Sequence, residues 1–469
     1  MIEFETYYIT DCQGFQYFRD DADGSEYVYT ELEPDYCHIC FPCFDQPDLK
    51  ATHKSCVVAP ADWEVITNSA NIFKTAPIKI TSDDQGFKGA LKRFEIAQDS
   101  DILTSFGDSD VIVHEFQRTQ KISTYLFAFV AGPFDCHKPS PEREAELPHI
   151  PMGFYCRKSL SKYAENMKDD WFRVSKASIR YYEKMFGTPY AFDKLDSIMC
   201  PDYAMGAMEN VGCITYNDDY VPRDENFTRY KQENIYNTIA HEISHQWFGN
   251  LVTMKWWDDL WLNESFANMI SYMAMDEGDG MDDITLAWNI FIDEQYSGLN
   301  EDQKNTSHPI AASCVHTGAA QDIFDGISYG KGAAFLHQMV FYLGKDILCE
   351  GLKTYFAKYK FQNTELEQFV DELRDAATRL GLQVDFKKWA KSWIESAGCA
   401  EIELKFDRDA DSGDLSNVRL VQTPYNTLNT PENRLRVQAL NIASLDEDMK
   451  VIDVVRVETS DSTSETAIQ

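Results

Sequence analysis

The sequence contains no run of 18 or more consecutive apolar residues, the length at which a helix becomes a candidate for crossing a bilayer. Its first residues, MIEFETYYITDCQGF, have neither a basic start nor a continuous apolar stretch, so they do not predict a secretory signal. Internal repeats and low-complexity tracts are absent as well. These absences indicate a globular protein with no visible membrane span.

Basic residues are scarce: 43 Lys and Arg stand against 77 Asp and Glu, a formal net charge of −34. Such a charge repels phosphate backbones and anionic lipid surfaces, so nucleic acid is not an expected partner. The same field attracts cationic ligands, a peptide amine among them, although an acidic balance more commonly only keeps a protein soluble.

Cysteine is also sparse, with twelve residues in 469, which excludes a dense disulfide scaffold and favours reduced thiols in the cytoplasm. Cys37, Cys40 and Cys43 form a C-x-x-C-x-x-C run. No suitable fourth cysteine follows closely, so we interpret the three as buried thiols and not as ligands of a metal cluster.

The patterning predicts a multi-domain α+β protein. Residues 1–137 are β-rich, with "FQYF" and "EYVYTEL" on either side of the turn-forming "DDADGS". Residues 400–458 alternate again, in "EIELKF", "RLRVQAL" and "DVVRV", and predict three or four strands of a partial β-sandwich. Residues 459–469 have little to bury and are expected to form a disordered tail.

Between these regions, residues 138–399 predict a mainly α-helical domain. Trp171, Val174, Tyr182 and Met185 share one face of an amphipathic segment that stops at Gly187. A later helix is expected to begin at "TELE", with Thr364 and Glu367 as a capping box.

The stretch "HEISHQWFGN", residues 241–250, has the spacing of a zinc site. On a helix, His241 and His245 lie on one face and can bind one ion, while Glu242 addresses a water molecule. A catalytic zinc usually has a third protein ligand, and Glu264 in "LWLNESFANM" follows after room for a turn and a second helix. The motif alone also occurs in ordinary cores, but the spacing of Glu264 favours a site for one Zn²⁺ per chain.

A second motif, "GAMEN" at residues 206–210, precedes the zinc helix. Its flanking residues predict an edge strand, whose free backbone groups can pair with an extended peptide. Glu209 is then placed to bind an ammonium group.

Together with "FPCFDQPDLKA" and "DGISYGKGA", these motifs resemble the aminopeptidase N family of zinc metallo-aminopeptidases, in the same order and with similar spacing. The resemblance runs from about residue 14 to about residue 440. It implies an N-terminal β domain, a thermolysin-like catalytic domain and a β-sandwich. Relatives carry further residues before the β domain and a large helical domain after the sandwich, so we expect this chain to hold an incomplete β domain and only the start of the sandwich.

The resemblance also implies catalytic roles. His241, His245 and Glu264 match the zinc ligands, and Glu242 matches the general base. Tyr329, in "ISYGKG", matches the tyrosine that donates a hydrogen bond to the developing oxyanion. A lone tyrosine beside glycines would otherwise be interpreted as a packing residue.

Substrate contacts follow from the same resemblance. Glu209 and Glu33 match the pair that binds the free α-amine, and Gly206 and Ala207 offer backbone to the peptide. Glu31 stands where relatives often have glutamine in the first side-chain pocket. Its extra charge leads us to expect a preference for Lys and Arg.

Met205 matches a hydrophobic wall of the same pocket, although a methionine there is equally compatible with ordinary core packing.

The sequence therefore predicts a zinc-dependent aminopeptidase acting on peptides with a free N-terminus, and it predicts no oligomeric state. One alternative is a bifunctional epoxide hydrolase and aminopeptidase of the leukotriene A4 hydrolase type. That branch has a second glycine where this chain has Ala207, which favours peptide hydrolysis. The other alternative is an interaction protein made catalytically inert by truncation.

Overall fold

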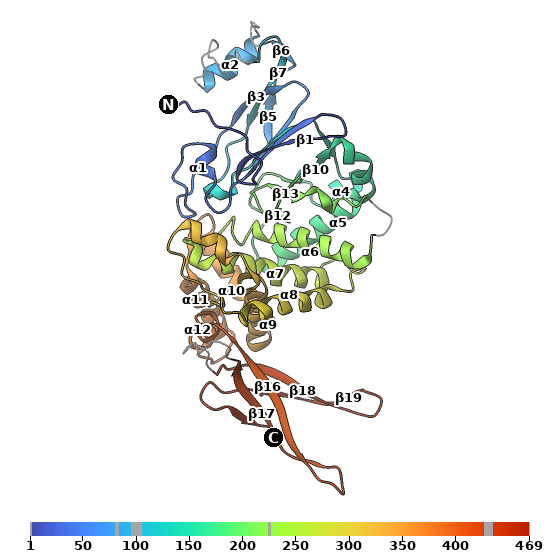
Figure 1. Ribbon diagram of the computed structural model, residues 1–469, viewed down its shortest axis with the longest axis vertical. Coiled ribbons are helices and arrows are strands. Elements are labelled where there is room, and N and C mark those ends of the chain that lie inside the picture. Colours follow the sequence, from blue (N-terminus) through green and yellow to red (C-terminus); the bar gives the residue numbers. More distant parts are fainter. Residues whose placement is uncertain (1, 80–83, 95–105, 224–226, 426–434, 469) are drawn as a thin grey trace.

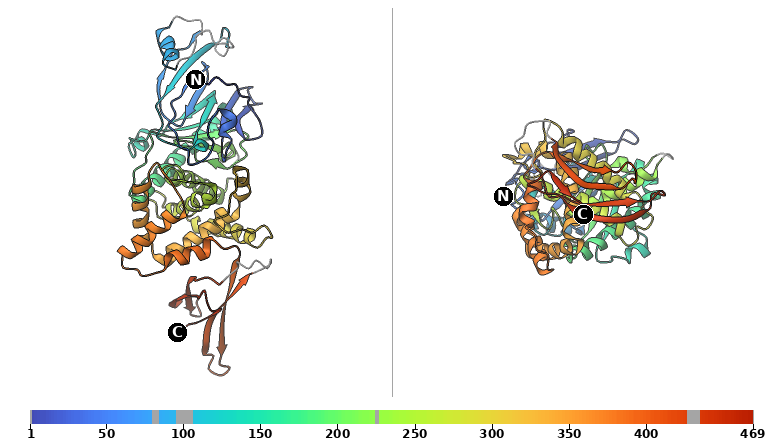
Figure 2. Two further views of the ribbon diagram at one scale, coloured as in Figure 1. Left: turned by 90° about the vertical axis from the view of Figure 1, so that its left-hand side faces the viewer. Right: turned by 90° about the horizontal axis from the view of Figure 1, so that it is seen from below.

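The computed structural model describes residues 2–79, 84–94, 106–223, 227–425 and 435–468 (Figure 1). β-Sheets lie at one end of the elongated molecule, a helical body lies in the middle, and thin strands project from the other end (Figures 1 and 2). Among the described residues, no helix has both the length and the apolar character needed to cross a membrane. The α+β class expected from the sequence is confirmed.

Two sheets form most of the N-terminal part, which the sequence analysis predicted to be β-rich. The first has the order β1-β2-β8-β4, with β1 (Gly14–Arg19), β2 (Glu26–Glu31), β8 (Phe129–Gly132) and β4 (Glu64–Thr67). In the second, β7 (Asp110–Phe116) pairs with β3 (Cys56–Pro60), β5 (Asn71–Lys74) and β6 (Ile78–Lys79). The helices of this part are α1 (Cys37–Cys40), which buries both of its cysteines, α2 (Gln85–Arg93) and the short η1 (Thr124–Leu126).

A five-stranded mixed sheet joins this part to the helices. Its order is β12-β13-β11-β10-β9, made by β12 (Ala207–Met208), β13 (Cys213–Asn217), β11 (Leu195–Cys200), β10 (Met152–Arg157) and β9 (Phe134–His137). The sequence predicted β12 as an edge strand but did not predict the sheet. β11 is buried at every position, so it lacks the alternation that identifies a half-exposed strand.

The helices that build the site follow. They are α5 (Ser161–Phe186), α6 (Arg229–His245), α7 (Leu260–Glu277), α8 (Ala287–Asp302) and the π-helix η6 (Ile327–Lys331). α5 ends where predicted, because Gly187 adopts a left-handed conformation with φ of 60°.

The remaining helices complete the body. They are η2 (Lys158–Leu160), η3 (Asp218–Tyr220), η4 (Trp257–Asp259), η5 (Thr317–Ile323), α4 (Pro141–Glu144), α9 (Gly332–Leu343), α10 (Lys345–Tyr359), α11 (Leu366–Arg379) and α12 (Phe386–Ile394).

The predicted capping box of α11 is wrong by one residue. Glu365 and Gln368 make the reciprocal bonds, in place of Thr364 and Glu367. Thr364 is unavailable because it belongs to β15 (Asn363–Thr364), which pairs with β14 (Thr253–Met254).

Two small antiparallel sheets form the C-terminal part, with orders β16-β17-β20 and β18-β19. Their strands are β16 (Cys399–Arg408), β17 (Leu415–Tyr425), β18 (Ala439–Leu445), β19 (Val451–Glu458) and β20 (Glu465–Ala467). The expectation of a disordered tail over residues 459–469 is wrong for the described residues up to 468. β20 pairs with β17 through its backbone, so the segment is ordered without burying many side chains.

Candidate active site

Two neighbouring helices bring the three predicted metal ligands together. His241 and His245 lie in the last turn of α6, with their Nε2 atoms 2.9 Å apart. The chain turns at Gly249, and α7 packs against α6 and places Glu264 Oε2 3.5 Å from both Nε2 atoms. All three side chains are buried or nearly so.

The outer nitrogens of both imidazoles are occupied. His241 Nδ1 lies 2.9 Å from Asn268 Oδ1, and His245 Nδ1 lies 3.1 Å from the Phe248 carbonyl. Hydrogen bonds from Nδ1–H to these oxygens direct each Nε2 toward Glu264. Donor atoms around a tetrahedral zinc ion stand about 3.3 Å apart, which is close to the three separations seen here. The residues therefore fit a zinc ion.

A pair of glutamates lies beside this cluster. One oxygen each of Glu33, Glu209 and Glu264 lies within 4.8 Å of the others. Asn263 donates to Glu209 Oε1 over 3.0 Å, whereas Glu33 Oε1 is buried and has no hydrogen-bond partner among the described residues. A group with several N–H donors, such as an ammonium, would satisfy these oxygens.

The buried charges do not balance. Burial, followed by the charges of Glu209 and Glu264, raises the pKa of Glu33 well above its usual range. Burial also raises the pKa of Glu242, against the opposing effect of His245. For His245, burial favours the neutral form, but the carboxylates of Glu209 and Glu264 outweigh it and raise the pKa to about 10. The site thus has an excess of negative charge that a bound dication would offset, in place of a proton on His245.

Tyr329 lies against the histidine pair. Its ring stacks on that of His241, with centroids 6.3 Å apart and an interplanar angle of 18°. It belongs to η6, a π-helix, a form that is rare and often found at functional sites. Ser265 Oγ donates to the Ser328 carbonyl over 2.5 Å, which ties the helix of Glu264 to the turn that carries Tyr329.

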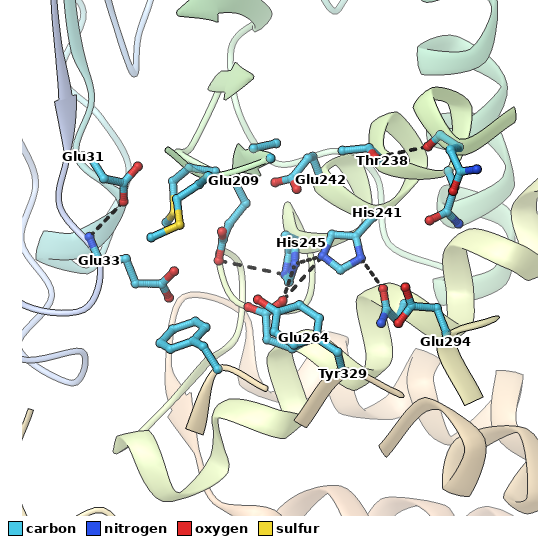
Figure 3. A pocket seen from close by; sticks show the side chains of 18 of the residues that line it. Glu31, Glu33, Glu209, Thr238, His241, Glu242, His245, Glu264, Glu294 and Tyr329 are labelled. Carbon is cyan, nitrogen blue, oxygen red and sulfur yellow. Dashed lines mark hydrogen bonds and ion pairs between the residues drawn. The ribbon is translucent and has the colours of Figure 1, made fainter. Parts of the chain in front are cut away.

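These groups line one cavity of about 410 Å³ (Figure 3). It is lined by Glu31, Glu33, Met205, Gly206, Ala207, Met208, Glu209, Asn234, Asn237, Thr238, His241, Glu242, His245, Glu264, Asn268, Tyr272, Glu294, Gln321, Phe324 and Tyr329. Every site residue predicted from the sequence is in this set.

Glu31 and Met205 lie toward one end of the cavity. Tyr203 donates a short hydrogen bond to Glu31 Oε2, and the Glu33 backbone N–H donates to Oε1 over 3.3 Å. Burial raises the pKa of Glu31 to about 7. Met205 is 42% exposed and is therefore not a core residue.

The strand β12 offers backbone next to the metal ligands. Ala207 pairs with Tyr216 of β13, and the other edge of β12 has no strand partner in the described parts of the chain. The Gly206 carbonyl already accepts from the Asn217 N–H, so the side toward β13 is used and only the outer edge can receive a peptide.

Several supporting residues escaped the sequence analysis. Gln246 and Asn250 donate to the Glu209 carbonyl over 3.1 and 2.8 Å, and Asn263 and Asn268 hold Glu209 and His241. Local signals existed for these four, because two lie in "HEISHQWFGN" and two flank Glu264 on α7. No local pattern marked Glu294.

Outside the cavity, Cys37, Cys43 and Asp45 offer possible ligand atoms within 4.8 Å of one another. The Asp45 oxygens, however, accept from the His38 N–H over 2.8 Å and from Thr124 Oγ1 over 2.5 Å. Cys37 and Cys40 are buried as predicted, whereas Cys43 is only partly buried.

The arrangement is that of a metallopeptidase: a β domain is followed by a helical domain, in which two histidines and a glutamate lie at a cavity. The sequence profile of the Peptidase M1 N-terminal domain matches residues 1–83, and that of the Peptidase family M1 domain matches residues 172–393. The chain belongs to peptidase family M1.

Curated relatives agree with this assignment. Aminopeptidase N of Streptomyces lividans is 33% identical over 400 residues, covering 85% of this chain and 41% of the relative. Aminopeptidase M1 of Arabidopsis thaliana is 30% identical over 392 residues, covering 83% of this chain and 39% of the relative. Leucyl aminopeptidase of Saccharolobus solfataricus is 32% identical over 342 residues, covering 72% and 38%. The chain thus spans about two fifths of the length of these relatives, and none of the three names supports the epoxide hydrolase alternative.

Proposed function

We propose that this chain is the catalytic part of a zinc-dependent aminopeptidase that removes the N-terminal residue from peptides. One observation carries the proposal: the buried carboxylates of Glu33 and Glu209 lie directly beside the cluster of His241, His245 and Glu264. A peptide whose α-ammonium lies between those carboxylates has its first carbonyl next to the metal ligands. This placement selects the first peptide bond.

His241, His245 and Glu264 would hold one zinc ion. Zinc bound there supplies Lewis acidity, which acidifies water and polarises a carbonyl group. The hydrogen bonds of the two Nδ1 atoms keep the Nε2 atoms oriented for this role.

Glu242 is the proposed general base. It lies on α6 directly after His241, and its Oε2 atom is buried without a hydrogen-bond partner among the described residues. An unpaired carboxylate oxygen can accept a proton from the attacking water and pass it to the departing amine. Tyr329, stacked on His241, is the proposed donor to the oxyanion.

The first side chain of the peptide would enter the end of the cavity lined by Glu31 and Met205, while its backbone pairs with the outer edge of β12 at Ala207, next to Gly206. Because the pKa of Glu31 is near 7, its charge, and with it the preference for Lys and Arg, depends on pH in the neutral range.

The test measures hydrolysis of Ala-, Leu-, Arg- and Glu-aminoacyl fluorogenic amides by the zinc-loaded protein and by Glu242→Gln. We expect turnover by the parent and a fall of about 10²- to 10⁴-fold in kcat for the variant, the range typical of a general acid or base. Zinc content should be equal in the two proteins, since Glu242 is not a proposed ligand.

Glu367→Gln is a matched control, because Glu367 is an exposed glutamate on the remote helix α11. It should retain the parental rate. A folded, zinc-bound parent without turnover would contradict the proposal and support the alternative of a protein that only binds.

A further inference from the structure

Glu294 lies in the same cavity but away from the proposed amine site. It comes from α8, and it lines the cavity together with Asn237 and Thr238 of α6. Figure 3 shows Glu31 and Glu33 on one side of the histidine pair and Glu294 on the other. The cavity therefore has an acidic group at each end.

The carboxylate of Glu294 has no partner among the described residues. Among the residues that the structure describes, none forms a hydrogen bond or an ion pair with it, and no Lys or Arg lines the cavity. Burial, and then the charge of Asp293, raises the pKa of Glu294. A partly buried carboxylate is less well hydrated than one on the open surface, and a cation placed beside it would offset this loss of hydration.

The backbone that carries Glu294 is held firmly against the turn of Tyr329. A Cβ atom on Gly330 would lie 2.2 Å from the Glu294 carbonyl oxygen, and one on Gly298 would lie 2.3 Å from the Lys331 nitrogen. α8 and η6 therefore touch through their backbones at these two glycines, which places the backbone of Glu294 directly against the turn that carries Tyr329.

The direction of the bound peptide follows from the proposed function, on which this inference rests. With the α-ammonium between Glu33 and Glu209 and the first carbonyl at the histidine pair, the chain after the cleaved bond continues past His241 toward Glu294. We propose that Glu294 binds a cationic side chain on the residue after the cleaved bond, so that the enzyme prefers Lys or Arg at the second position of its peptides.

The experiment compares kcat/KM for Leu-Lys-Ala-Ala, Leu-Met-Ala-Ala and Leu-Glu-Ala-Ala, which differ only at the second residue. We expect the parent to favour Lys over Met, and Glu294→Gln to lower this ratio about tenfold, as for the loss of one charge-assisted hydrogen bond. The change should fall mainly on KM, because the contact is to a part of the substrate that does not react.

Asp293→Asn is the matched control. Asp293 is the preceding residue on the same helix, but it is exposed and accepts a hydrogen bond from the Tyr230 hydroxyl over 2.5 Å. The Asp293→Asn variant removes the same charge from α8 and should leave the ratio of kcat/KM for the Lys peptide to that for the Met peptide unchanged. A second variant, Glu294→Arg, should shift the preference toward the Leu-Glu peptide.

The outcomes separate the two proposals. If the parent cleaves these peptides and the ratio is the same in the parent and in both Glu294 variants, the role of Glu294 is refuted and the proposed function stands. An equal fall of the ratio in Asp293→Asn would also refute the role of Glu294, since the overall negative charge of α8 would then explain the preference. A parent that cleaves no peptide refutes the proposed function and this inference with it.

Discussion

At the scale of single residues, Glu31 links side-chain preference to pH. Its carboxyl is buried against the Tyr203 hydroxyl, with Glu33 and Glu209 nearby, and burial raises its pKa to about 7. We expect the ratio of kcat/KM for Arg-amide to that for Leu-amide to rise between pH 6 and pH 8, as Glu31 becomes charged. The ratio is informative because titration of the substrate α-amine and of the catalytic groups affects both amides alike.

The Glu31→Gln variant should show a ratio that does not change over this range. Glu26→Gln is the control, since Glu26 is an exposed glutamate at the opposite end of β2. An identical pH slope in the parent and in Glu31→Gln would show that another group sets the preference.

The same residue should affect stability. The pKa of Glu31 is raised from 4.5 to about 7 in the folded protein. The stability that the protonated carboxyl contributes to the fold is therefore fully present below pH 4.5 and is lost as the pH rises through 7. This difference in pKa between the unfolded and the folded state corresponds to about 3 kcal/mol in the free energy of unfolding. We therefore expect Glu31→Gln to come closest to the parent in thermal unfolding near pH 4.5 and to unfold at a higher temperature than the parent at pH 8. A constant difference in Tm at both pH values would contradict this linkage.

At the scale of elements, the turn between α6 and α7 sets the site. Gly249 has a φ of 108°, and a Cβ there would lie 2.1 Å from Asn263 Oδ1. Asn263 donates to Glu209 and lies 3.3 Å from His245 Nδ1. Gly249→Ala should therefore displace Asn263 and lower kcat/KM by at least tenfold, an effect of about 1.4 kcal/mol or more.

Gly381→Ala is the matched control for backbone strain. Its φ is 84°, also in the left-handed region, but a Cβ there would meet nothing within 4 Å. Both variants should lose about 1 kcal/mol of stability from the strained backbone, whereas only Gly249→Ala should lose activity. Equal activity in the two, measured on Leu-amide, would show that the position of Asn263 is not critical.

At the level of helices and strands, the sequence was informative where apolar residues recur with helical spacing or where metal-binding residue types occur at the spacing of a known site. The amphipathic face of α5 indicated a helix that the structure contains, and the spacing of His241, His245 and Glu264 indicated three side chains that the structure brings together. The mixed sheet was not predicted, because a strand buried on both faces, such as β11, has no alternating pattern. The order of the tail was missed because β20 is held by backbone pairing, which leaves little trace in side-chain composition.

At the scale of the whole molecule, the site is assembled from distant parts of the chain. Glu31 ends β2 of the N-terminal sheets and Glu33 lies in the turn after it, Glu209 directly follows β12 of the mixed sheet, and Glu294 comes from a helix that carries no recognisable motif. Motif resemblance found the first three. Glu294 required the packing of α8 on η6, which no sequence pattern expresses.

This assembly concentrates six glutamates and two histidines around one cavity, with no lysine or arginine among the described residues that line it. Close like charges inside a protein oppose folding unless a cation compensates them. Removing the metal with a chelator should therefore lower the Tm, by the equivalent of roughly 4 kcal/mol if free zinc had been about a thousandfold above its Kd. Added zinc should restore the Tm, measured by differential scanning fluorimetry.

The variant His245→Ala separates this effect from a general action of the chelator. It lacks one proposed ligand, so its Tm should be low from the start and should not respond to chelator or zinc. Glu242→Gln keeps all three proposed ligands and should respond as the parent does. If chelation removes zinc from the parent, as measured by elemental analysis, without changing the Tm, then the buried carboxylates are compensated in another way and the proposed coupling between metal and fold is wrong.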